Sequence, residues 1–240
     1  MKKVLILLLI ASSLIVGNFG KEVKADQQSN MDKANNAHKN GDYEMAFNLL
    51  EPLAKQGFAQ AQNNLGSMYS NGQGVLKDYK KAVYWYQKAA EQGYALAQYD
   101  LGVHYSNGQG VLKDYRKAVY WYQKAAEQGF AQAQNNLGAM YRQGLGGPQD
   151  YEEALRWFRR AAEQGNGGAQ NHLGLMYFEG EGIAKDEIEA YKWAYLSAEQ
   201  GVEQAILAVE FLEQQLSPEQ IREAKRLAKE WTPKGEEIEL

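Results

Sequence analysis

The sequence has no cysteine, only four prolines and no excess of positive charge. The lack of cysteine excludes disulfide bonds, thiolate metal sites and cysteine nucleophiles. A net charge of −4 at pH 7 lacks the basic footprint that binding to nucleic acid requires. Alternating runs of β-branched and polar residues are missing, whereas Ala, Gln, Glu, Lys and Leu are abundant. The composition therefore favours a helical protein and argues against nucleic acid as its partner.

An apolar run near the N-terminus covers the 13 residues from Val4 to Val16. Two lysines precede it, and Val23 and Ala25 stand at the −3 and −1 positions of a possible cleavage before Asp26. This pattern predicts a signal peptide over residues 1–25, because a helix needs ~20 residues to cross a bilayer. An uncleaved membrane anchor is the alternative. We expect a periplasmic or secreted protein with no stable membrane insertion after cleavage near Ala25. Removing four Lys and one Glu would change the net charge from −4 to −7.

A period of 36 residues organises the rest of the chain. The strings Asn71–Gly93 and Asn107–Gly129 differ at one position, where Arg116 replaces Lys80. Glycines, Leu-Gly pairs, tyrosines and tryptophans recur in phase, and the tryptophans are Trp85, Trp121, Trp157 and Trp193. Such a period predicts a stacked array, because one short unit cannot bury its apolar face alone.

Each repeat is predicted to contain a helix A followed by a helix B. In the first full repeat, helix A covers residues 59–71 and ends at Gly72, because glycine adopts the left-handed conformation that closes a helix. Gly66 is expected to let helix B approach closely. Asp78 is the expected N-cap of helix B, which continues to about Gln92. On helix B the recurring tryptophan is phased with the buried alanines, and the tyrosines on either side of it are expected to be partly exposed.

The string AxAQxxLGxxYxxGxGV over Ala59–Val75 and the string DYxKAxxWxxKAAEQG over Asp78–Gly93 resemble the Sel1-like repeat family, a relative of the tetratricopeptide repeats. The resemblance implies an all-α fold, a right-handed α/α superhelical solenoid of helix pairs with capping helices. Ser217, Pro218 and Gln220 predict a capped start for the last helix. The expected organisation is a tetratricopeptide-like capping pair over 26–57, four repeats over 58–93, 94–129, 130–165 and 166–201, capping helices over 202–231 and an acidic tail over 232–240.

We find no residues that assemble into a catalytic or metal site, and we expect no cofactor. The three histidines, His38, His104 and His172, never have the i, i+4 spacing of paired metal ligands. The recurring aspartates would lie ~10 Å apart in stacked repeats, which is too far for one Ca²⁺, and are better explained as helix caps. These aspartates are Asp78, Asp114, Asp150 and Asp186.

The candidate protein-binding site is the inward face of helix A, because helix A lines the concave surface in the tetratricopeptide relatives. An Asn side chain both donates and accepts, and a ladder of them can pair with an extended peptide backbone. Tyr99 and Leu175 would anchor side chains of the partner. Plain solvent exposure of the Asn positions is the alternative. The candidate residues are Asn63, Ser67, Asn71, Tyr99, Val103, Asn107, Asn135, Ala139, Gln143, Asn171, Leu175 and Glu179.

The expected function is therefore an exported protein–protein interaction scaffold or adaptor in the bacterial envelope, and not an enzyme. Its partner would be a protein or an extended peptide. Arg142 is nearly the only cation on the A helices of the full repeats, which disfavours capture of an acidic terminus. The alternative is a cell-wall or β-lactam hydrolase, an activity linked to disulfide-rich exported members of the family. The lack of cysteine and of a nucleophile–base pair opposes it.

Overall fold

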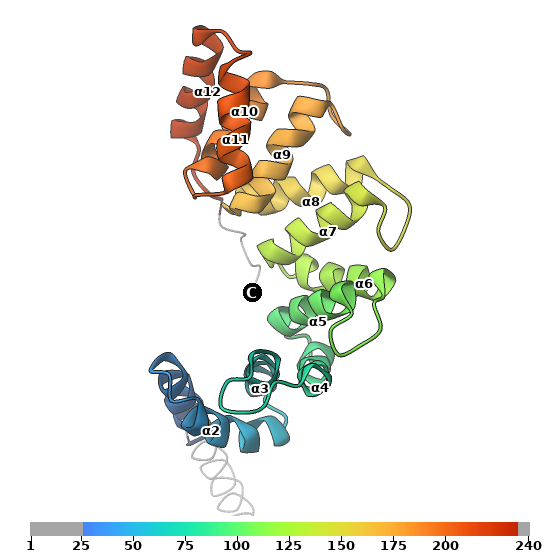
Figure 1. Ribbon diagram of the computed structural model, residues 1–240, viewed down its shortest axis with the longest axis vertical. Coiled ribbons are helices and arrows are strands. Elements are labelled where there is room, and N and C mark those ends of the chain that lie inside the picture. The colour runs from blue at the N-terminus through green and yellow to red at the C-terminus, as the bar shows by residue number, and fades with distance from the viewer. Residues whose placement is uncertain (1–25, 235–240) are drawn as a thin grey trace, which may run out of the picture. The chain divides into compact units, whose positions relative to one another are not determined.

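The computed structural model describes residues 26–234, and these residues form twelve helices and no strands (Figure 1). The predicted signal peptide over residues 1–25 and the last six residues of the acidic tail lie outside the described residues. The helices form two compact units that divide between Gln92 and Gly93, and each unit is described by itself. The prediction of an all-α repeat fold is confirmed.

The N-terminal unit consists of two helix pairs. Its core is formed by Leu50, Leu53, Leu65 and Met68, whose side chains are at most 3% exposed. The pairs correspond to the predicted capping pair and to the first full repeat. The helices are one over residues 26–39, α2 (Tyr43–Lys55), α3 (Ala59–Asn71) and α4 (Tyr79–Glu91).

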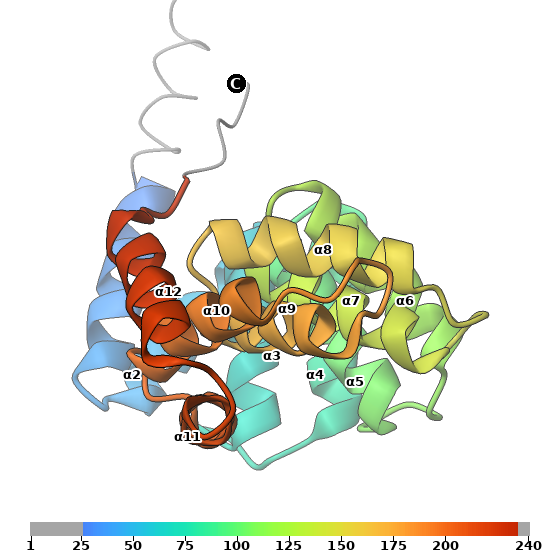
Figure 2. The ribbon, with the colours of Figure 1, turned by 90° about the horizontal axis from the view of Figure 1, so that it is seen from above.

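The C-terminal unit contains four helix pairs in which successive helices pack against each other. The last helix is an exception, because α12 packs against α10 (Figure 2). We call α3, α5, α7, α9 and α11 the A helices, and α4, α6, α8, α10 and α12 the B helices. The bounds in this unit are α5 (Ala95–Asn107), α6 (Tyr115–Glu127), α7 (Ala131–Gln143), α8 (Tyr151–Glu163), α9 (Gly167–Glu179), α10 (Glu187–Ala198), α11 (Glu203–Glu213) and α12 (Pro218–Glu230).

Glycines end the A helices of the full repeats, and aspartates begin the B helices that follow. Gly72 has a φ of +74°, a left-handed conformation that costs a residue with a side chain free energy. The Asp78 carboxylate accepts hydrogen bonds from the backbone N–H groups of Lys80 and Lys81 at 3.0 and 3.1 Å. The other recurring aspartates also cap their helices, and the predicted capping role is confirmed for all four. These local signals explain why the predicted and observed helix ends agree closely.

A glycine on helix A allows each of the first three full-repeat pairs to pack closely. A Cβ atom at Gly66 would lie 2.8 Å from Cδ1 of Tyr86, well inside van der Waals contact. At Gly102 the corresponding distance to Cδ1 of Tyr122 is 2.6 Å. The predicted role of Gly66 is therefore confirmed.

The prediction for the tyrosines beside each tryptophan was half wrong. Tyr84 and Tyr120 are each 53% exposed, as expected, but Tyr86 and Tyr122 are buried. Their rings fill the space above the helix-A glycines, whereas Trp85 is only partly buried. Successive residues on a helix point about 100° apart, and the glycine decides which of the two neighbouring aromatic residues faces helix A.

Buried glutamines connect successive helices of the stack. Gln134 on α7 is fully buried, and its Nε2 donates to the carbonyl of Ala126, at the end of α6, at 3.1 Å. Its Oε1 accepts a 2.7 Å hydrogen bond from Gln164, at the end of α8. One side chain therefore joins three helices. Gln170 makes the same two contacts one repeat later, with Ala162 and Gln200.

The last helix begins and ends with specific contacts. Ser217 Oγ accepts a hydrogen bond from the N–H of Gln220, whose side chain accepts from the N–H of Ser217, which confirms the predicted capping box. Beyond α12, the ring of Trp231 meets that of Trp193 edge to face at 5.8 Å. The N–H of Lys234 then donates to the carbonyl of Glu163 at 2.8 Å. The segment after α12 therefore returns to the end of α8.

Candidate protein-binding surface

The candidate binding residues lie on the A helices of the two units, and their exposure increases toward the C-terminal end of each helix. In the N-terminal unit, Asn63 on α3 is buried, Ser67 is partly buried and Asn71 is exposed. The Nδ2 of Asn71 donates to Ser67 Oγ at 3.2 Å. In the C-terminal unit, the partly buried residues are Tyr99, Val103, Asn135, Ala139, Asn171 and Leu175, and the exposed ones are Asn107, Gln143 and Glu179.

The first candidate position contacts a neighbouring helix on α5 and on α7. Asn135 Oδ1 on α7 lies 3.1 Å from Nδ1 of His172 on α9. The Tyr99 hydroxyl is hydrogen-bonded to Asn136, and its ring centroid lies 5.2 Å from that of Phe130. These contacts hold both side chains against neighbouring helices. Of the candidate residues, the third position of each helix is the exposed one: Asn71, Asn107, Gln143 and Glu179.

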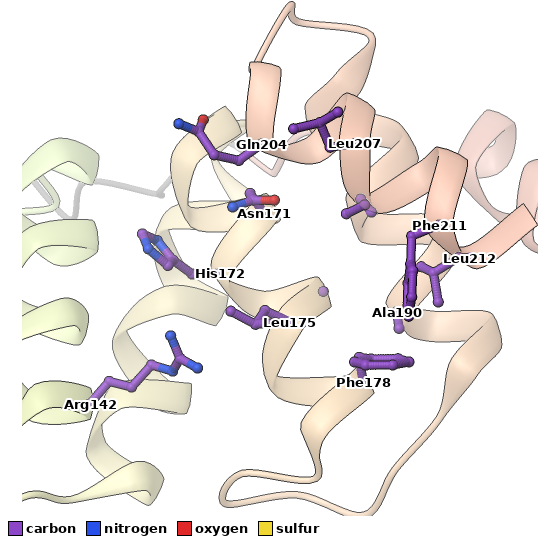
Figure 3. Close-up of a pocket in the computed structure, with 13 residues that line it drawn as sticks. Arg142, Asn171, His172, Leu175, Phe178, Ala190, Gln204, Leu207, Phe211 and Leu212 are labelled. Atoms are coloured by element: carbon purple, nitrogen blue, oxygen red, sulfur yellow. The ribbon is translucent and has the colours of Figure 1, made fainter.

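A groove between α9 and α11 is the main concave feature that the structure adds to the candidate surface (Figure 3). Its volume is about 480 Å³, within the 300–1,000 Å³ range of small ligand pockets. Leu175 and Phe178 form the α9 side, and Leu207 and Phe211 form the α11 side. The rings of Phe178 and Phe211 meet edge to face at 5.7 Å. Two candidate residues, Asn171 and Leu175, line this groove.

The polar part of the groove contains Arg142 and His172. Arg142 forms ion pairs of 2.6 Å with both Glu179 and Glu181, whose negative charges compensate its positive charge. The imidazole of His172 stacks on Phe158 with ring centroids 4.6 Å apart. Burial, and then the positive charge of Arg142, lower the pKa of His172, which favours the neutral form of the ring. The groove therefore presents an apolar surface without an uncompensated cation.

Asp100 is an unusual carboxylate on α5. The corresponding residues of the neighbouring repeats are Asn64 and Asn136, which have no charge. Burial raises the pKa of Asp100 from 3.8 to about 7. Burial, together with the charge of Asp100, also raises the pKa of Tyr99. The arrangement therefore holds a carboxyl group whose pKa lies near neutral pH.

The other chemical candidates have structural partners. His38 Nε2 lies 3.1 Å from the side-chain oxygen of Gln73, and His104 Nδ1 lies 2.9 Å from the carbonyl of Gln109. Among residues 26–234, no group of three His, Cys, Asp or Glu side chains is placed to hold a metal ion. Over the same residues, no helix combines the length and apolar content needed to cross a membrane.

Sequence reasoning missed the residues that α11 and its neighbours contribute to the groove. It treated α11 as a cap, although Leu207 and Phe211 are 65% and 49% exposed. The signal was present in the sequence, because Leu207 and Phe211 are four residues apart and share one face of the helix. A helix whose only role is to cap the array would carry polar residues on this face.

Comparison with known proteins identifies the repeats. The Sel1 repeat family model matches residues 39–58, 59–94, 95–130, 131–166 and 168–202. A Sel1 repeat protein from Oxalobacter formigenes is 40% identical, with a TM-score of 0.69 over 75% of this chain and 74% of its own. A putative Sel1 repeat protein from Klebsiella pneumoniae is 26% identical, with a TM-score of 0.52 over 78% of this chain and 93% of its own.

A third similar structure is a protective antigen, with an SLR fold, present in uropathogenic Escherichia coli strains. It is 46% identical, with a TM-score of 0.65 over 66% of this chain. The match covers 34% of the antigen, and this chain therefore corresponds to about a third of it. The comparison with curated proteins finds no match.

Proposed function

This chain belongs to the Sel1-repeat family, and we propose that it is an exported, non-enzymatic scaffold that binds a protein partner on the A helices of its C-terminal unit. Sel1-repeat proteins generally take part in protein–protein interactions. The observation that carries the proposal is the groove between α9 and α11, where Leu175, Leu207 and Phe211 offer apolar surface to a partner. Burial of apolar surface is the dominant favourable contribution in most protein–protein association.

Export is supported by the sequence of residues 1–25, which has the three parts of a signal peptide. The test is N-terminal sequencing of the protein recovered from the native bacterium, after separation of periplasm, membranes and medium. We expect a mature chain that begins at Asp26. An unprocessed chain in the membrane fraction would instead indicate an anchor, and a chain in the cytoplasm would show that export is wrong.

Binding is tested by crosslinked capture from native cells with two matched variants. Leu175→Ser changes the A helix α9, and Tyr120→Ser changes an exposed residue on the B helix α6. Tyr99 is not used, because its contacts with Phe130 and Asn136 would confound binding with stability. We expect a protein captured by the wild type and by Tyr120→Ser to be lost with Leu175→Ser. Equal capture by all three would move the site away from these A helices.

A further inference from the structure

Helix α11 is covered on one side only. It packs against α10, while α12 passes it and packs against α10 instead. Leu207 and Phe211 of α11 therefore stay exposed where they line the groove (Figure 3). Exposed apolar surface next to a preformed groove is characteristic of an interaction site.

The apolar side chains that line the groove have the spacing of helix-packing surfaces. Leu175 and Phe178 are three residues apart on α9, and Leu207 and Phe211 are four apart on α11. Ala190 and Ala194 of α10, four residues apart, also line the groove and leave room because they are small. Rows of this kind accept side chains at i, i+3 and i+4 of another helix.

Charge is distributed unevenly between the two kinds of helix in the C-terminal unit. Its A helices carry one cation, Arg142, and five carboxylates, whereas its B helices carry eleven cations and nine carboxylates. Arg142 is already paired with Glu179 and Glu181. Glu179 is paired with Arg142, Glu213 is paired with Lys225 of α12, and burial raises the pKa of Asp100 to about 7. The unpaired negative charge of these A helices therefore belongs to the two remaining carboxylates, both on α11.

Two of these carboxylates lie beside the exposed apolar residues. Glu203 and Glu210 are exposed, and they are four residues before and three residues after Leu207 on α11. Side chains at these spacings share a helix face. Helix α11 has no Lys or Arg of its own. An occupant of the groove therefore meets apolar surface flanked by negative charge.

We propose that the groove between α9 and α11 binds a cationic amphipathic helical segment of a protein partner. Apolar side chains of this segment would enter between Leu175 and Phe211, and its Lys or Arg residues would face Glu203 and Glu210. This inference rests on the proposed scaffold function and specifies its partner. The same carboxylates disfavour an acidic segment, an anionic membrane surface and a second copy of α11, because like charges repel across an interface.

The direct test uses three short fluorescent peptides and the purified full chain. The first carries Leu on one helical stripe and Lys elsewhere, the second replaces every Lys by Glu, and the third is a scrambled form of the first. Binding is measured by fluorescence anisotropy at low and high salt. We expect the Leu/Lys peptide to bind, and the Leu/Glu and scrambled peptides to bind about tenfold or more weakly. Added salt should weaken binding of the Leu/Lys peptide.

Variants of the chain then locate the site. Leu207→Ser/Phe211→Ser should weaken binding of the Leu/Lys peptide about tenfold or more. Glu203→Lys/Glu210→Lys should also weaken this binding and should make it less dependent on salt. Leu112→Ser is the matched control, because this leucine is 91% exposed between α5 and α6. Both double variants change exposed residues, and their melting curves should match the wild type. If Leu207→Ser/Phe211→Ser lowers the melting temperature, the site is located from the binding of Glu203→Lys/Glu210→Lys alone.

Several outcomes would overturn the inference. Binding that is unchanged in both double variants would show that the peptide binds elsewhere. Equal binding of the Leu/Glu peptide would contradict the role of charge, and equal binding of the scrambled peptide would contradict the role of the apolar helical stripe. A dimer in sedimentation velocity that Leu207→Ser/Phe211→Ser abolishes would make a second copy the occupant. If the Leu/Lys peptide does not bind, but Leu175→Ser still abolishes capture of a protein from native cells, only this inference is wrong. If both experiments fail, the scaffold function is wrong as well.

Discussion

The substitution Gln134→Leu removes a side chain that joins α6, α7 and α8. Gln134 is fully buried, and the change loses its hydrogen bonds to the Ala126 carbonyl, at 3.1 Å, and from Gln164, at 2.7 Å. The Ala126 carbonyl keeps its bond from the N–H of Gly129, and the cost is therefore that of two hydrogen bonds rather than of an orphaned group. At about 1–1.5 kcal/mol for each buried bond, we expect a loss of about 2–3 kcal/mol in unfolding free energy.

The assay is urea unfolding followed by far-UV circular dichroism, with hydrogen exchange of the α6–α8 amides as a local measure. The local measure is needed because repeat arrays do not always unfold in one step. Gln132→Leu is the matched control, since Gln132 lies on the same helix and is exposed. If Gln134→Leu and Gln132→Leu differ by less than about 0.5 kcal/mol, the glutamine contacts do not stabilise the stack in the way described.

Three further substitutions have expected results. Asp100→Asn should stabilise the chain by about 2–4 kcal/mol at pH 8 and little at pH 4. The reason is that the pKa of Asp100 is about 7 in the folded state and 3.8 in the unfolded state, so the wild type loses stability as the pH rises between these values. Equal urea midpoints of variant and wild type at pH 8 would contradict this. His172→Asn should reduce the loss of stability on acidification below about pH 6.5, because the lowered pKa of His172 makes the folded state bind fewer protons than the unfolded state. If the melting temperatures of variant and wild type fall in parallel as the pH is lowered, this reasoning is wrong. Gly102→Ala should cost about 1–3 kcal/mol in thermal unfolding, because its Cβ would lie 2.6 Å from the ring of Tyr122, whereas Gly147→Ala, which meets nothing within 4 Å, should cost much less.

The sequence predicted the helices well because their ends depend on local chemistry. Gly72 and Asp78 act on backbone groups within a few residues, and the 36-residue period repeats the same signals. The contacts between helices were harder to predict. The bond between Gln134 and Gln164 joins residues thirty apart, and nothing in the local pattern shows which of several glutamines is buried.

The candidate surface was predicted as positions on helices rather than as a shape. The sequence placed Asn135 and Leu175 on the same side, but it could not show that Asn135 contacts His172 while Leu175 lines a groove. The groove itself depends on where α12 packs. Because α12 packs against α10 and not over α11, Leu207 and Phe211 stay exposed.

The central claim, that a protein partner binds the A helices of the C-terminal unit, is tested most directly by site-specific photocrosslinking in native cells. A photoreactive amino acid is placed at Gln143 or Leu207 on the A helices of this unit and at Tyr120 on its B helix α6, all exposed positions. We expect one protein to be crosslinked from the A positions and not from Tyr120. Crosslinks from Tyr120 alone would contradict the account.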